Sequence, residues 1–368
     1  MKKTLVCLAG LIAVAIFFCR HFRAEPSAEL ESAVAQPADV EPAPGGSLAI
    51  PRQPVRVLPA AEISPVDNNV LRRVAVGDTN VFKLSAEQIQ AFLARNRQNA
   101  DSLLAAFNVT ADPEFLREAA RRYPSNAFVL AAALGNDISP AQRREWIDRF
   151  KQVSSENPLP NYLSASDYLQ KQQPQQALQE IADASAKRGF NDYTVDRMQG
   201  LEELYLSSGY STAEAKALAT MSVQEPALPV LRNLANDLST MERQYAATGD
   251  SASVAAIARL GLGLAANVTD AGARSLGTQL LGASLERDFL TGLDPGGAYD
   301  FLQQPIGERL AQLRADRNAV LEDSKLANNW LATANEPQLV SYFDRMKLYG
   351  EAAALQWART QMDGNSKP

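Results

Sequence analysis

Helix-start signals recur along most of this chain, and they constrain its fold more than any other feature. Ser85–Gln88 and Ser211–Glu214 are capping boxes, each followed by apolar residues at helical spacing. Asp112–Pro113 and Ser139–Pro140 each combine a capping side chain with a proline, which is favoured at the first helical position. The sequence therefore predicts a succession of helices from residue 85 onward.

Composition agrees with an all-α chain. Aromatic residues make up only 7% of the sequence, while the strong helix formers Ala, Leu, Gln and Glu are abundant. Strand-like alternation occurs in one place, from Val70 to Leu84, and the same residues also fit an extended lead-in to the first helix.

A longer period runs through the middle of the chain. Pro124 and Pro158 lie 34 residues apart, each between two predicted helices. In the unit that begins at Pro158, some positions of the repeat hold small residues and others hold large ones. The small residues are Ala165, Ala177 and Ala184, and the large ones are Tyr168 and Ile181. This pattern resembles the tetratricopeptide repeat, well over Tyr162–Ala184 and weakly in the two flanking units, so that it covers about residues 109–226. The resemblance implies an antiparallel helix-hairpin array, a tetratricopeptide-like solenoid; a plain array of α-hairpins is the alternative.

The C-terminal region, residues 227–362, is predicted to be helical but less regular. Small residues such as Gly282 suit close helix packing, and the final hairpin turns at Gly350. The terminal helices of such arrays cap an exposed apolar face, which is the role expected here. The long polar helix Ile306–Thr333 leaves self-association open as a weaker hypothesis.

The N-terminus predicts contact with a membrane. An apolar run at residues 4–19 is flanked by Lys2 and Lys3 on one side and by Arg20 and Arg23 on the other. We expect residues 1–23 to form a single transmembrane helix that is retained as an anchor; secretion after cleavage of a signal peptide is the alternative.

Residues 24–68 are rich in proline, alanine and acidic side chains, and we expect a disordered linker there. After the linker we expect an extended lead-in at 69–84 and a helical-repeat region at 85–226. The C-terminal region follows, and residues 363–368 are expected to form a disordered tail. An anchor followed by such a spacer resembles bacterial inner-membrane proteins that present a domain to the periplasm.

Several function classes are disfavoured by composition. Cys7, Cys19 and His21 are the only cysteines and the only histidine, so the rest of the chain lacks the commonest metal ligands and the usual neutral-pH base. The formal net charge of -6 argues against nucleic acid as a partner. We expect no metal, no cofactor and no catalytic activity.

The favoured functional hypothesis is a membrane-tethered module that binds a protein or peptide. Tyr162, Ser166 and Gln170 lie four residues apart on the face that tetratricopeptide helices turn towards their groove, and we expect this face to be partly exposed. Tyr162 as a core residue is the alternative. A cell-envelope hydrolase or carbohydrate-acting domain is the second hypothesis, and it needs a buried acid of raised pKa, for example among Asp167, Glu180 and Glu202.

Overall fold

The computed structural model describes residues 73, 78–136, 140–187, 189–270, 275–331 and 333–365. Within these residues every regular element is a helix, which confirms the predicted all-α class. The predicted anchor at 1–23 and linker at 24–68 lie outside the described residues. Of the segment with strand-like alternation, the described part is mainly the 3-10 helix Thr79–Phe82 and contains no strand.

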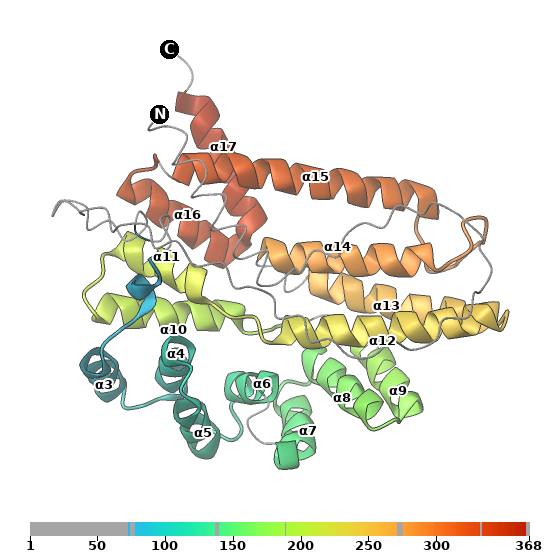
Figure 1. The fold of residues 1–368 in the computed structure, drawn as a ribbon, viewed down its shortest axis with the longest axis horizontal. Helices are drawn as coiled ribbons and strands as arrows, with labels where there is room; N and C mark the ends of the chain where they lie inside the picture. Colours follow the sequence, from blue (N-terminus) through green and yellow to red (C-terminus); the bar gives the residue numbers. More distant parts are fainter. Residues whose placement is uncertain are drawn as a thin grey trace, which may run out of the picture.

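Short helices joined by tight turns make up the first half of the described chain. Each packs on the next from α3 to α9 along one edge of the molecule (Figure 1), as expected of helices that bury an apolar stripe. Their bounds, with those of the next two helices, are α3 Ala86–Arg95, α4 Ala100–Thr110, α5 Pro113–Arg122, α6 Ala127–Gly135, α7 Arg143–Val153, α8 Leu159–Gln170, α9 Pro174–Ser185, α10 Thr194–Ser207 and α11 Thr212–Ser222.

Side-chain caps begin three of these helices where the sequence predicts them. The capping boxes Ser85–Gln88 and Ser211–Glu214 form at α3 and α11, and Asp112 caps α5 ahead of its proline. The start predicted at Ser139–Pro140 differs in detail. A 3-10 turn, Pro140–Gln142, precedes α7, which begins without a side-chain cap.

Four longer helices lie side by side above the short ones (Figure 1): α12 Ala227–Ala247, α13 Ser251–Asp270, α14 Leu276–Thr291 and α15 Ile306–Leu331. Glycines let α13 and α14 approach each other. A Cβ atom added at Gly261 would lie 2.4 Å from the ring of Phe289, and one at Gly282 would lie 2.0 Å from Thr269 Oγ1. The predicted packing role of Gly282 is thereby confirmed.

Helices that are distant in the sequence also pack together. Helix α10 lies against α3 and α4, α12 against α8, and α13 against α9. In a linear solenoid each unit contacts only its neighbours. This chain instead turns back over its first helices, so that the long helices cover one side of the short ones (Figure 1).

The last two helices, α16 Glu336–Tyr349 and α17 Glu351–Asn365, form the predicted hairpin through Gly350. Helix α16 packs on α11, and α17 packs on α15. Trp330 of α15 contacts the rings of Tyr342 and Trp357, with centroids 5.7 and 5.5 Å away. Packing therefore crosses the boundary that we placed between residues 226 and 227. Helix α17 ends at Asn365, three residues into the predicted tail.

Helix α13 is also the one helix among the described residues that is long and apolar enough to cross a membrane, over Ser251–Thr269. It packs against α9, α12 and α14, and its side chains Ile257, Leu264 and Val268 are buried. Contact with three neighbouring helices buries 39% of this stretch and so accounts for part of its apolar composition.

Candidate functional site

The predicted binding face on α8 is mostly covered. Tyr162 is fully buried and Ser166 is 6% exposed, whereas Gln170, at the end of the helix, is exposed. The hydroxyl of Tyr162 accepts a 2.8 Å hydrogen bond from Nδ2 of Asn267 on α13. Our expectation of partial exposure is therefore wrong for Tyr162 and Ser166, because α12 and α13 pack over the hairpin of α8 and α9. A role for this face in binding stays a prediction, and Gln170 is the residue of the three that is exposed to a partner.

Asp167, one of the acids considered for a hydrolase, is buried between basic side chains. It accepts hydrogen bonds from Arg144 and, at 3.0 Å, from Lys171. Burial alone would raise its pKa, but the hydrogen bonds from Lys171 and Arg144 outweigh burial, and the pKa is lowered from its ordinary value. A carboxylate held charged in this way does not suit a general acid.

The other two candidate acids are also paired. Glu180 forms an ion pair with Lys151. Glu202 accepts hydrogen bonds of 2.6 Å from both Lys216 and Lys347, which ties α10 to α11 and α16. These carboxylates take part in helix packing.

An open groove of about 450 Å³ lies between α3, α4 and α5. Its apolar lining comes from Leu93, Leu103 and Phe115. Its polar lining consists of Gln90, Gln98, Glu114, Arg117, Glu118 and Arg121. The groove therefore combines an apolar strip with charged borders.

The turn between α3 and α4 fixes one end of this groove. Arg97 and Gln98 both have left-handed backbone conformations, with φ of 53° and 50°. In this conformation the carbonyl oxygen of Gln98 accepts a 3.0 Å hydrogen bond from the hydroxyl of Tyr123, and its side chain accepts one of 2.8 Å from Arg122. The α3–α4 turn is thus attached to the end of α5.

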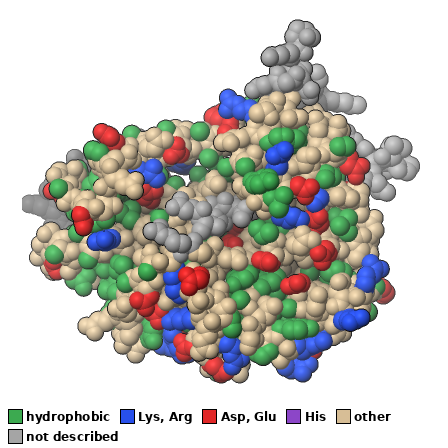
Figure 2. Space-filling view, turned by 180° about the vertical axis from the view of Figure 1, so that it is seen from behind, with side chains coloured by type: hydrophobic (Ala, Val, Ile, Leu, Met, Phe, Trp, Pro, Cys, Tyr) green, Lys and Arg blue, Asp and Glu red, His purple; other side chains and the backbone are tan. Residues whose placement is uncertain are grey.

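Charges on the border of the groove are largely paired with each other. Glu114 contacts Arg117, and Glu118 pairs with Arg121 at 2.7 Å. Basic and acidic side chains are likewise interspersed over the face of the molecule in Figure 2. Within the apolar strip, Leu93 and Leu103 are each only 2% exposed and form the floor of the groove, so the partly buried Phe115 is the apolar side chain best placed for recognition.

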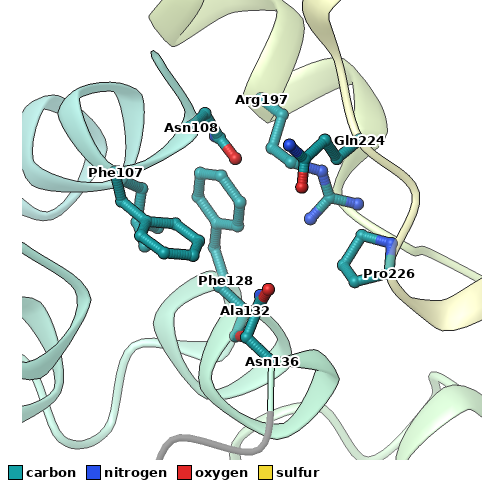
Figure 3. A pocket seen from close by; sticks show the side chains of 9 residues that line it. Phe107, Asn108, Phe128, Ala132, Asn136, Arg197, Gln224 and Pro226 are labelled. Atoms are coloured by element: carbon teal, nitrogen blue, oxygen red, sulfur yellow. The ribbon is translucent and has the colours of Figure 1, made fainter. Parts of the chain in front are cut away.

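A smaller, more enclosed cavity lies where α4, α6 and α10 meet the segment between α11 and α12 (Figure 3). Its empty space is about 260 Å³ including the mouth, and its interior has room for about one water molecule. The cavity is lined by two aromatic rings and three amide side chains, namely Phe107, Phe128, Asn108, Asn136 and Gln224. The guanidinium of Arg197 points into it. We call this space the Arg197 cavity.

Arg197 itself is 3% exposed, an uncommon degree of burial for an arginine. Its Nη2 donates hydrogen bonds to the backbone oxygen of Asp192 and, at 3.5 Å, to Oγ1 of Thr194. Its Nε, also buried, has no hydrogen-bond partner among the described residues. The ring of Phe128 lies 5.8 Å from the guanidinium carbon.

Three acids, Asp192, Asp196 and Glu225, lie close enough to Arg197 for their charges to act on it. The carboxylate of Asp192 accepts hydrogen bonds from the backbone nitrogen and the hydroxyl of Thr194, at 3.0 and 2.9 Å. Glu225 accepts one of 3.5 Å from Thr278. Burial, together with the charge of Asp192, raises the pKa of Glu225 to about 7. In the described part of the chain, Arg197 forms no salt bridge.

Sequence reasoning overlooked Arg197, although a signal was present. Arg197, Leu201 and Leu204 are spaced as one face of a helix, so a charged residue falls in an apolar stripe. The groove gave no such signal, because it forms from three helices whose mutual positions the sequence pattern does not specify.

Over the described residues, no group of three His, Cys, Asp or Glu side chains is placed to hold a metal ion. No protein-family model, curated protein or solved structure matches the chain significantly.

Proposed function

We propose that this chain is a membrane-tethered helical module of the bacterial cell envelope that binds a protein or peptide partner and has no catalytic role. The binding role is inferred from the groove between α3, α4 and α5. Its apolar strip lies between charges that already pair with each other, and Phe115 is the side chain of that strip that a partner can still cover. We infer that the partner presents a short amphipathic segment whose apolar face covers Phe115, above the floor that the buried Leu93 and Leu103 form.

The N-terminal sequence supports a tether. The apolar run at residues 4–19 is close to the length of a membrane-spanning helix, and the proline-rich linker at 24–68 would separate the helical domain from the bilayer. We place the domain in the periplasm, with secretion as the alternative. Fractionation of cells that express the full chain or a variant lacking residues 1–23 distinguishes the two, because only an anchored chain needs this segment to stay in the membrane fraction.

The resemblance to tetratricopeptide repeats supports a binding role in the same sense. Ala165, Ala177, Ile181 and Ala184 are fully buried in the hairpin of α8 and α9, as that repeat requires of its small and large core positions. A cell-envelope hydrolase is the alternative. Asp167 does not suit it, since this acid is paired and has a lowered pKa, whereas the buried Glu225, with a pKa raised to about 7, has the property that such an enzyme needs.

Affinity purification of the full chain from detergent-extracted native membranes, after crosslinking, tests the proposal. Phe115→Asp places a charge in the apolar strip and should remove a specific partner. Ala256→Asp, at an exposed position of α13, is the matched control and should retain it. Circular dichroism checks that both variants are folded. A partner that Phe115→Asp retains as well as the wild type does would contradict binding in the groove.

A further inference from the structure

We propose that the Arg197 cavity is a binding site for one carboxylate group. The inference is independent of the groove, since α4 contributes different residues to each: Leu103 to the groove, and Phe107 and Asn108 to the cavity. It rests on an enclosed space with a buried cation that points into it (Figure 3).

The first step concerns charge. A buried guanidinium with an unpartnered nitrogen is costly, and native structures normally pair such a group with an acid, a water molecule or a bound ligand. Among the described residues, Arg197 forms hydrogen bonds only to neutral oxygens of Asp192 and Thr194, and these use a single nitrogen. The charges of Asp192, Glu225 and Asp196 act on the guanidinium from nearby, but none of these carboxylates is bonded to it among the described residues, so an anion in the cavity would be its first direct charge partner.

The second step concerns shape. A guanidinium presents its donors in a planar fork that matches the two oxygens of a carboxylate. The amides of Asn108 and Gln224 border the same space with their oxygens towards it, so each would donate to a ligand from its nitrogen once the amide group has turned over (Figure 3). The rings of Phe107 and Phe128 offer an apolar wall to the carbon end of the ligand.

The third step concerns access. The cavity has room for about one water molecule, so a carboxylate enters only if the mouth opens slightly. Gln224 and Asn136 at the mouth are both exposed. Nδ2 of Asn136 donates a 2.8 Å hydrogen bond to Ala132, which holds that side chain in place. Gln224 is thus the side chain at the mouth that we expect to rotate when a ligand enters.

Titration of the full chain in detergent with ¹³C-formate at constant ionic strength, followed by NMR, tests the site. Sodium chloride is the reference salt, and the ¹⁵Nε signal of Arg197 reports binding at the cavity. We expect saturable binding of formate that shifts this signal. Asn108→Leu and Gln224→Leu should each weaken binding about tenfold, as for the loss of one hydrogen bond to a charged group, and Arg197→Met should abolish it. Arg243→Met, at an exposed arginine of α12, is the charge-matched control and should bind like the wild type.

Two further probes separate the sources of the carboxylate. N-acetylalanine represents the C-terminus of a peptide, and N-acetylalaninamide is its uncharged counterpart. Tighter binding of N-acetylalanine than of formate, with no binding of the amide, assigns the site to a peptide terminus. Binding of formate alone assigns it to a small free carboxylate. The proposal is overturned if formate binds no better than chloride, or if Asn108→Leu and Gln224→Leu leave binding unchanged; these two variants decide the matter even if Arg197→Met does not fold.

Discussion

The hydroxyl of Tyr162 on α8 accepts a 2.8 Å hydrogen bond from Nδ2 of Asn267 on α13, across 105 residues of sequence. Both side chains are buried, and the same amide group also approaches the backbone oxygen of Ala184 at 3.4 Å. This contact joins the best tetratricopeptide-like hairpin to the long helices that cover it. It explains why a residue at a groove-facing sequence position lies in the core.

Replacing Tyr162 by Phe should destabilise the protein by about 1–2 kcal/mol, because the amide of Asn267 loses its best buried acceptor. Urea unfolding followed by circular dichroism measures the change. Tyr349→Phe, at a side chain that is 67% exposed, is the control and should stay within about 0.5 kcal/mol of the wild type. Equal effects of the two substitutions would show that the buried hydrogen bond contributes nothing.

Replacing Gly282 by Ala should cost about 1–3 kcal/mol, as for overpacking of a core. The new methyl group would lie 2.0 Å from Thr269 Oγ1 and 3.2 Å from the backbone oxygen of Ala265, so either Thr269 rotates and loses its 2.9 Å hydrogen bond to Ala265 or α13 and α14 move apart. Gly307→Ala on α15 provides the opposite case. No atom lies within 4 Å of the added carbon there, and higher helix propensity should raise stability by up to about 1 kcal/mol. Thermal unfolding of both variants compares them directly.

Replacing Glu202 by Gln should cost about 3 kcal/mol, since two lysines at a largely buried position lose their shared counter-charge. Hydrogen exchange should rise first in α16, which this carboxylate connects to α10. The adjacent Glu203 is exposed and, in the part of the chain that the structure describes, accepts a hydrogen bond only from Gln199, so Glu203→Gln is a near-neutral control. Unchanged exchange in α16 would contradict the linking role of Glu202.

Stability should fall as pH rises from about 5 to 8. Burial and the charge of Asp192 raise the pKa of Glu225 from 4.5 to about 7, while Ser275 and Arg197 act in the opposite direction and Glu351 adds to the increase. The folded state then keeps a proton that the unfolded state has released, and the free energy of unfolding falls through this window. The size for one such group is about 3 kcal/mol.

Glu225→Gln should remove much of this slope. Burial also raises the pKa of Glu242 to about 7, so part of the slope should remain until Glu242→Gln is added. Glu308→Gln, at an exposed position of α15, should leave the slope intact. Urea unfolding at several pH values gives the comparison, and a wild type whose stability rises over this range would contradict the assignment.

Local features of the fold were predictable from the sequence because local physics determines them. The capping boxes at Ser85 and Ser211 form as expected, and the C-terminal hairpin turns at Gly350. These signals depend on side chains within one turn of each other.

Long-range packing was not predictable in the same way. Helical periodicity shows that Tyr162 and Arg197 lie on particular faces, but it does not show which distant helix covers each face. Helix α13 covers the first, and the second closes a cavity with α4 and α6. The groove and the Arg197 cavity both depend on such contacts, so they emerge only once the helices are placed.

Photo-crosslinking from inside the groove is the most direct test of partner binding. The full chain carries p-benzoylphenylalanine in place of Gln90, an exposed residue of the groove, or in place of Ala256 as a control, and is irradiated in native membranes. We predict one discrete adduct from position 90 that disappears with Phe115→Asp, and none of that mass from position 256. The same adduct from both positions, or no adduct from position 90, would contradict binding of a partner in the groove.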